Sequence, residues 1–170
     1  MPYHVLESVV KALNQYKKAL NGAKVLVLGV AYKRDIDDLR ESPALTIIEL
    51  LQKDGAQVSY NDPYFPTVGK GRKYDLQMKC APLDNLGQYD CVLIVTDHSD
   101  YDYARIVQES QLVVDTRSAT RGIKSHSKQY DPCTLNALRY VDMHCLCCIT
   151  VWSVSLMPQN VQQTVRPLLA

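Results

Sequence analysis

Hydrophobic and polar residues follow two different periods along this chain, and their succession predicts alternating helices and strands. Residues 1–22 carry apolar side chains at the spacing of one helical face, which predicts a helix that ends at Gly22. The apolar positions of this face are Leu6, Val9, Val10, Leu13, Tyr16 and Leu20. The next stretch, KVLVLGV, is a continuous apolar run. Such a run is typical of a strand buried on both faces of a parallel sheet.

The rest of the chain repeats this succession of helix and strand. Ser42 suits the cap of a second helix and Pro43 its first position, and the apolar spacing continues that helix to Gly55. A helical turn is predicted at LDNLGQY and a helix at DYARIVQES. Strands are predicted at AQVSYND, DCVLIVTDH and QLVVDTR, with a shorter extended piece around LQMKCAPL.

Strands that alternate with helices of this length predict βαβ units with right-handed crossovers. The expected fold is therefore α/β, a Rossmann-like open parallel sheet with helices on both faces, formed by residues 23–122. One helix, residues 1–22, precedes it, and an irregular tail, residues 123–170, follows it.

Composition narrows the classes of partner. The chain has 170 residues, 46% of them hydrophobic, and a formal net charge of +1. We expect one globular domain, and no general attraction to nucleic acid or to a membrane. Because no signal peptide and no bilayer-spanning apolar run is recognisable, a cytoplasmic location is expected. The six cysteines are then expected to be thiols.

The turn after the first strand, VAYKRDIDDLRESP, combines one preceding glycine with many charges. In doubly wound sheets the ligand lies outside the carboxyl ends of the strands, where the strand order reverses. Lys33, after the first strand, and Arg117, after the last, are expected to meet there and hold a pyrophosphate. Dinucleotide binding needs three glycines, and only Gly29 is present. Asp62, in the position of a ribose-binding acid, carries little weight without them, so NAD is not expected to bind this chain.

Four motifs occur in a characteristic order: KVLVLGVAYKRDIDDLRESPA, VSYNDPYFP, DCVLIVTDHSDYD and LVVDTRSATRG. With them, residues 1–122 resemble the C-terminal domain of the UDP-glucose/GDP-mannose dehydrogenase family. The resemblance is greatest to its UDP-N-acetylglucosamine 6-dehydrogenase branch. The leading MPYHVLESVVKALN is similar to the end of the long central helix that joins the two halves of those enzymes.

The resemblance implies a division of labour between two halves. Family members oxidise the C6 alcohol of a nucleotide sugar to a carboxylate in two NAD-dependent steps. Their N-terminal domain binds NAD, and their C-terminal domain binds the nucleotide end of the UDP-sugar. Tyr32 and Lys33 match the family's aromatic-lysine pair at the substrate, and Arg117 matches the arginine that contacts the diphosphate.

Other residues are expected to shape the site rather than to bind the ligand. Arg40 matches a characteristic family arginine and is expected to shape the turn through ion pairs with Asp37 or Asp38. His98, in the TDH sequence, could suggest general-base chemistry. Because no nucleophile lies near it in the motif, we expect a loop residue that shapes the site.

The family's catalytic cysteine, in a Cys-x-Pro-Lys-Asp segment, has no counterpart in this sequence. Cys80 and Cys91 are interpreted as buried apolar residues. The chain alone is therefore expected to be inactive, with its partner either an N-terminal NAD-binding half or another copy of the chain. The second partner would use the first helix, provided that its apolar face is exposed. The alternative is a non-catalytic nucleotide-binding or subunit-interaction module.

The tail from Ile123 matches no part of the family. HCLCC, with His126 and Cys133, offers zinc-ligand residue types, but its spacing does not fit paired ligand knuckles, so no metal is expected. A truncated gene with a shifted or unrelated reading frame after Gly122 is a hypothesis that would explain this tail.

Overall fold

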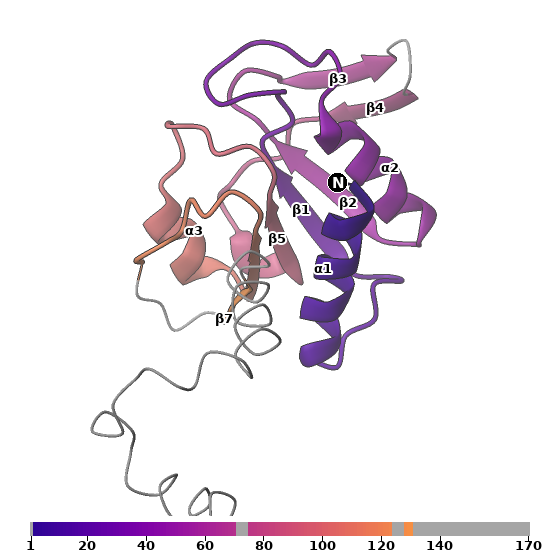
Figure 1. The fold of residues 1–170 in the computed structure, drawn as a ribbon, viewed down its shortest axis with the longest axis vertical. Coiled ribbons are helices and arrows are strands. Elements are labelled where there is room, and N and C mark those ends of the chain that lie inside the picture. The colour runs from indigo at the N-terminus through magenta and orange to yellow at the C-terminus, as the bar shows by residue number, and fades with distance from the viewer. Residues whose placement is uncertain (1, 71–74, 124–127, 131–170) are drawn as a thin grey trace, which may run out of the picture. The chain divides into compact units, whose positions relative to one another are not determined.

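A parallel sheet forms the centre of the fold in the computed structural model (Figure 1), which describes residues 2–70, 75–123 and 128–130. The sheet has five strands in the order β2-β1-β5-β6-β7, and every neighbouring pair is parallel. The strands are β1 (Lys24–Leu28), β2 (Gln57–Asn61), β5 (Cys91–Ile94), β6 (Leu112–Asp115) and β7 (Lys128–Tyr130). The chain passes from β1 to β2 on one side and returns to β5 on the other. The strand order therefore reverses between β1 and β5.

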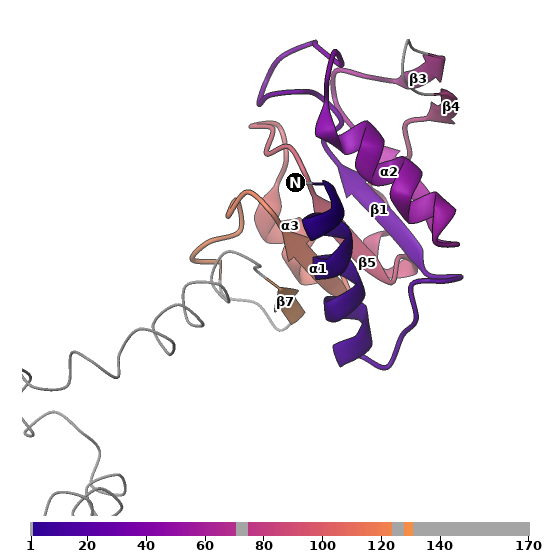
Figure 2. The same ribbon diagram turned by 45° about the vertical axis from the view of Figure 1, so that its right-hand side comes forward.

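Helices cover both faces of this sheet, as the sequence predicts. Figure 2 shows α1 (Pro2–Gln15) and α2 (Pro43–Lys53) side by side, and both pack on the sheet face that includes Val25 and Val27. The opposite face, with Leu26 and Leu28, packs against α3 (Tyr103–Glu109) and the 3₁₀ turn η1 (Leu86–Gln88). Alternate residues of a strand point to opposite faces, so one apolar run supplies both cores.

The beginning of α2 follows the predicted capping chemistry. The Ser42 hydroxyl accepts a hydrogen bond from the Ala44 N–H at 3.3 Å, and Pro43 opens the helix. The helix ends at Lys53, and Gly55 follows with a φ of +87°. These local signals place α2 directly after the charged turn, which is the part of the chain that carries the candidate site.

The predicted end of the first helix at Gly22 is wrong. The helix ends at Gln15, and Lys17 takes a left-handed φ of +57°. The N–H groups of Lys17 and Lys18 donate to the carbonyls of Asn14 and Leu13, at 3.0 and 3.1 Å, which is a Schellman termination. Leu20 is buried beyond this turn. It therefore extended the helical spacing in the sequence without belonging to the helix.

The apolar face of α1 is covered by the chain's own core. Val9 and Leu13 are 0% and 1% exposed, and Leu6 and Val10 pack partly buried against the same cluster. This cluster includes residues of α2 and of the central strands. The exposed apolar stripe that would favour a partner on this helix is therefore not present on this face.

Two short strands, β3 (Thr67–Lys70) and β7, were not predicted. β3 pairs antiparallel with β4 (Asp75–Lys79) in a separate hairpin, and β4 overlaps the extended piece expected around residues 76–83. β7 adds three residues to the edge of the sheet, inside the segment expected to be irregular. Such short strands depend on pairing with distant residues and carry little pattern of their own.

Within the described ranges, no helix is long and apolar enough to cross a membrane. The same ranges contain no group of three or more His, Cys, Asp or Glu residues that could hold a metal ion. The zinc assessment of His126, Cys133 and HCLCC lies outside the described residues, as does most of the tail.

Candidate functional site

The loop of residues 29–41 joins β1 to α2 at the carboxyl end of the sheet, and Gly29 opens it. Gly29 has a φ of +78°, and a Cβ atom added there would lie 2.3 Å from the Thr96 carbonyl oxygen. Its N–H donates to the Asn61 carbonyl at 3.0 Å, and the Thr96 hydroxyl donates to the Ala31 carbonyl at 2.8 Å. The single glycine of this turn therefore allows close contact between the ends of β1 and β5.

Asp62, directly after β2, anchors this loop through hydrogen bonds to its backbone. One carboxylate oxygen accepts hydrogen bonds from the N–H groups of Val30, at 2.7 Å, and Ala31, at 3.1 Å. The other oxygen accepts from the N–H of Tyr64 at 2.9 Å. The side chain is completely buried. This acid is therefore engaged by its own chain, in contrast to the solvent-facing acid that would bind a ribose.

His98 completes the anchor and is 0% exposed. Its Nδ1 accepts a hydrogen bond from the Asp35 N–H at 3.0 Å, and its Nε2 lies 3.1 Å from the Asp62 carboxylate. Since a backbone N–H can only donate, the ring proton belongs on Nε2, which donates to Asp62. The ring packs between Tyr64 and Tyr101, with centroid distances of 5.0 and 5.9 Å. This geometry supports the expected site-shaping role.

The tip of the loop is tied to the turn after β5. Asp35 has a left-handed φ of +56°, and its carboxylate accepts from the Ser99 hydroxyl at 2.6 Å and from the Ser99 N–H at 2.8 Å. These hydrogen bonds lower the pKa of Asp35, with a smaller contribution from the neighbouring Arg34. The loop is thus held at its first residues by Asp62 and at its tip by Ser99.

Arg40 pairs with Asp38, one of the two partners expected. Its Nε and Nη2 each lie 3.0 Å from a carboxylate oxygen of Asp38, and its backbone N–H donates to the same group at 2.9 Å. The hydrogen bonds from Arg40 lower the pKa of Asp38. Because the Arg40 side chain is 89% exposed, water screens this pair, and its effect is local to the turn.

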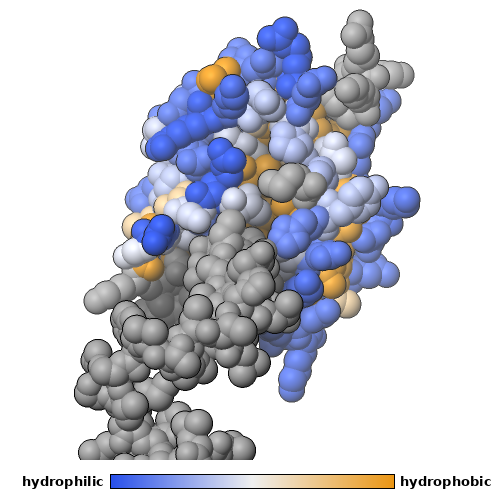
Figure 3. Space-filling view, viewed as in Figure 1, coloured by the Kyte–Doolittle hydropathy of each residue, from blue (hydrophilic) through white to orange (hydrophobic). Residues whose placement is uncertain are grey.

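The candidate ligand residues Tyr32 and Lys33 lie on the exposed part of this loop. The Lys33 ammonium is 5.2 Å from the centroid of the Tyr32 ring, which is 47% exposed. The Tyr32 N–H donates to the Asp38 carbonyl at 2.7 Å. Figure 3 shows that the top of the molecule, where this loop lies, is mainly hydrophilic. An aromatic ring and a cation are therefore presented together to solvent.

Arg117 is brought to the same edge by a turn after β6. The buried Asp115 accepts from the Arg117 N–H at 2.9 Å and, with its other oxygen, from the Thr120 N–H and hydroxyl at 2.7 and 2.8 Å. The Arg117 side chain is half exposed, and its Nε donates to Asp97 at 3.2 Å. No contact joins Lys33 to Arg117 within the described residues; Arg34 is the loop residue that reaches the same carboxylate.

Sequence reasoning missed the roles of Asp62, Arg34 and Asp97. The signal for Asp62 was an acid followed by proline at the end of a strand, which indicates a turn that needs its N–H groups satisfied. The signal for Asp97 was an acid directly before His98, at the end of a predicted strand. Neither signal identifies the partner, because the partners follow other strands.

The two described cysteines differ in their surroundings. Cys91 is completely buried in β5, and burial raises the pKa of its thiol to about 12. Cys80 is half buried, and its sulfur accepts from the Asn61 side-chain amide at 3.4 Å. The interpretation of Cys91 as a buried apolar residue is confirmed. The same interpretation does not hold for Cys80, which is only partly buried and lies beside the end of β2, with its sulfur 3.6 Å from the Asp62 carbonyl oxygen.

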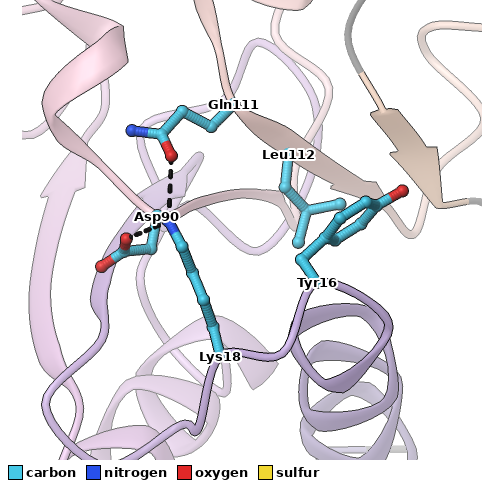
Figure 4. Close-up of a pocket in the computed structure, with 5 residues that line it drawn as sticks. All are labelled: Tyr16, Lys18, Asp90, Gln111 and Leu112. Carbon is cyan, nitrogen blue, oxygen red and sulfur yellow. Dashed lines mark hydrogen bonds and ion pairs between the residues drawn. The ribbon is translucent and has the colours of Figure 1, made fainter.

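A small pocket lies at the opposite, amino edge of the sheet (Figure 4). Lys18 reaches across it and donates to Asp90 at 2.6 Å and to Gln111 at 2.9 Å, while Tyr16 and Leu112 form its side. Asp90 also accepts from the Lys24 N–H at 2.9 Å. Lys18 thus connects Asp90 and Gln111 in this pocket, which indicates a structural joint between the segment after the first helix and the sheet.

Replacement of Asp90 by Asn is expected to lower the free energy of unfolding by about 1 kcal/mol at pH 7. Lys18 and the Lys24 N–H lower the folded-state pKa of Asp90. A lowered pKa stabilises the fold at a pH above the pKa of Asp90 in the unfolded chain. This contribution disappears as the pH falls through the pKa of Asp90 in the folded chain. Urea unfolding at pH 7 and at pH 3 should therefore show a difference between wild type and variant that shrinks in acid. A difference that is the same at both pH values would contradict this account, and the exposed Asp84→Asn is the control.

Comparison with known proteins shows which family this part of the chain is similar to. The UDP binding domain of the UDP-glucose/GDP-mannose dehydrogenase family matches residues 26–122. UDP-glucose 6-dehydrogenase of Rhizobium meliloti (strain 1021) is 28% identical over 139 residues, which cover 71% of this chain and 31% of the relative. UDP-N-acetyl-D-mannosamine dehydrogenase of Methanococcus maripaludis (strain C7) is 33% identical over 102 residues, 59% of this chain and 22% of the relative.

A UDP-N-acetyl-D-glucosamine 6-dehydrogenase of Pseudomonas aeruginosa is also similar, with 27% identity over 101 residues, 59% of this chain and 24% of the relative. Among solved structures, the NDP-N-acetyl-D-galactosaminuronic acid dehydrogenase of Methanosarcina mazei Go1 superposes with a TM-score of 0.56 at 26% identity. That match covers 76% of this chain and 29% of the other.

The chain thus spans less than a third of the length of these relatives. The family match covers more than half of the chain, includes both the loop after β1 and the turn after β6, and agrees with the motifs in the sequence. The chain belongs to the UDP-glucose/GDP-mannose dehydrogenase family and carries its C-terminal, UDP-binding domain.

Proposed function

We propose that this chain binds the nucleotide end of a UDP-sugar at the carboxyl ends of β1 and β6. It would act as the substrate-binding part of an NAD-dependent nucleotide-sugar 6-dehydrogenase. The observation that carries this proposal is the placement of exposed cations around the point where the strand order reverses. Lys33 lies on the loop after β1 and Arg117 on the turn after β6, each held by a network of backbone hydrogen bonds.

Each proposed ligand residue has a distinct task. The exposed Tyr32 ring offers a flat apolar surface to a base or a ribose. The Lys33 ammonium supplies a mobile positive charge, and the Arg117 guanidinium supplies a fork of N–H donors that matches a phosphate group. The backbone networks of Asp62 and Asp115 position these groups before the ligand arrives, which lowers the entropic cost of binding.

The described residues do not fit NAD. Val30 and Ala31 follow Gly29 where a dinucleotide loop needs further glycines, and both N–H groups are already bound to Asp62. Cys91, with its raised pKa, offers no thiolate near the strand ends. These observations support a division in which the nicotinamide cofactor and the nucleophile of the proposed reaction belong to another part of the enzyme.

Titration calorimetry of the purified chain is expected to show saturable UDP binding and no NAD binding. Arg117→Gln and Lys33→Gln should each weaken UDP binding by roughly 10- to 100-fold, because each removes a charge-assisted contact worth about 1.5–3 kcal/mol. Arg105→Gln is the matched control, since the Arg105 side chain on α3 is 50% exposed, as is that of Arg117.

The control should bind UDP as the wild type does. A folded chain that binds NAD but not UDP, or that binds neither ligand, would contradict the proposal. UDP binding that both substitutions leave unchanged would place the nucleotide elsewhere.

A further inference from the structure

Two arginines from different loops share one carboxylate at the centre of the carboxyl edge. The Arg117 Nε lies 3.2 Å from one oxygen of Asp97, and the Arg34 Nη1 lies 3.8 Å from the other. Arg34 follows β1, Asp97 follows β5 and Arg117 follows β6, and these three strands are neighbours in the sheet. The three side chains therefore span the point between β1 and β5 where the strand order reverses.

The contacts of the two guanidinium groups leave their terminal nitrogens available. Arg117 uses its Nε–H for Asp97, and Arg34 uses its Nε–H for the Ser99 hydroxyl at 3.2 Å. Within the described part of the chain, neither arginine donates a hydrogen bond from a terminal Nη atom, and the 3.8 Å ion pair is longer than a hydrogen bond. The arginine side chains are 55% and 50% exposed. Pairs of Nη–H donors are thus accessible for a phosphate group.

The positive charges of this cluster are largely offset by nearby carboxylates, so oriented N–H donors matter more for phosphate binding than net charge. Asp97 faces both arginines, and Asp35 lies 3.6 Å from the Arg34 Nε, so two carboxylates offset the two guanidinium groups. A cluster of this kind attracts anions weakly at long range. Its affinity for a phosphate depends on donors that are already aimed, which is the role that a shared carboxylate can perform.

We infer that Arg34 is a second guanidinium contact for the diphosphate of the ligand, and that Asp97 is the positioning residue that holds Arg34 and Arg117 ready for it. This inference rests on the proposed function, since it specifies the phosphate contacts of the same site. The aromatic-lysine pair that the family resemblance indicates, Tyr32 and Lys33, precedes Arg34 directly on the same loop.

The test compares UDP with uridine on the full chain, by calorimetry for UDP and by ligand-observed NMR for uridine. Arg34→Gln is expected to weaken UDP binding about tenfold and to leave uridine binding unchanged, because only the phosphate contacts are removed. Arg34→Lys keeps the charge but not the paired donors, and should recover less than half of the loss on a logarithmic scale. Arg105→Gln is the control and should bind both ligands as the wild type does.

Asp97→Asn separates positioning from simple charge. If the negative charge of Asp97 merely opposed the ligand, its removal would tighten UDP binding. The positioning role predicts the opposite, a loss of about threefold to tenfold, because the amide keeps one oxygen for only one of the two guanidinium groups and turns an N–H toward the other. Tighter binding by Asp97→Asn would overturn the positioning role.

Three further outcomes would overturn this inference, and they differ in what they imply for the proposed function. Wild-type UDP binding that depends on Arg117 but not on Arg34 would overturn the inference and leave the proposed function intact. A folded wild-type chain without UDP binding would overturn both. An equal loss of UDP and uridine binding in Arg34→Gln would also overturn the inference, because it would show a general disturbance of the loop.

Discussion

Asp62→Ala is expected to lower the free energy of unfolding by about 3–5 kcal/mol. The change leaves the N–H groups of Val30, Ala31 and Tyr64 without their acceptor, and His98 loses the partner of its Nε2. The lost acceptor is buried, and each donor that water does not reach costs about 1–3 kcal/mol. The same substitution should weaken UDP binding, because it releases the loop that carries Tyr32 and Lys33.

Urea unfolding followed by circular dichroism measures the first effect. Asp62→Asn should fall between wild type and Asp62→Ala, since it retains one oxygen but turns an amide N–H toward groups that also donate. The exposed Asp84→Asn is the control and should stay within about 0.5 kcal/mol of wild type. A loss for Asp62→Ala no larger than that of the control would show that Asp62 does not anchor the loop.

Gly29→Ala is expected to destabilise the fold by about 3 kcal/mol or more. The added methyl group would lie 2.3 Å from the Thr96 carbonyl oxygen, so either β1 and β5 separate at their carboxyl ends or the loop changes its path. The positive φ of +78° adds a further cost of about 1 kcal/mol for any residue with a Cβ atom. The loop that begins at Gly29 carries Tyr32 and Lys33, so UDP binding should be lost as well.

Gly22→Ala is the matched control for this prediction. Gly22 has a similar φ of +82°, but nothing lies within 4 Å of an added Cβ atom. It should therefore lose only the conformational contribution of about 1 kcal/mol, and it should bind UDP as the wild type does. Equal losses for the two variants in thermal unfolding would mean that the close approach of Gly29 to Thr96 contributes nothing measurable.

Local signals predicted most of the regular structure. The apolar runs of β1 and β5 and the cap of α2 at Ser42 and Pro43 each act within a few residues, so a single sequence contains them in full. The end of α1 was mistaken because a left-handed Lys17 terminates the helix, whereas the sequence offered a glycine five residues later. Glycine is the usual residue for that conformation, but here Lys17 adopts it instead.

In the candidate site, too, short motifs could be recognised in the sequence, whereas contacts between distant residues could not. Motifs located Tyr32, Lys33, Arg40 and Arg117, because each belongs to a short segment with its own residue order. The contacts that organise them join residues far apart in the chain, such as Asp62 with His98 and Arg34 with Asp97. The sequence suggested Lys33 as the companion of Arg117. The structure connects Arg34 to it instead, since adjacent residues on a loop point in different directions.

The α/β class, the burial of the central strands and the family could be predicted without a structure, because hydrophobic period, capping residues and ordered motifs are properties of short segments. The roles of the charged residues, by contrast, depend on the three-dimensional fold. It turned Asp62 into a buried anchor, made Gly29 a point of close contact and set two arginines on Asp97. These roles depend on which strand ends become neighbours, and strand order follows from packing of the whole sheet rather than from any one segment.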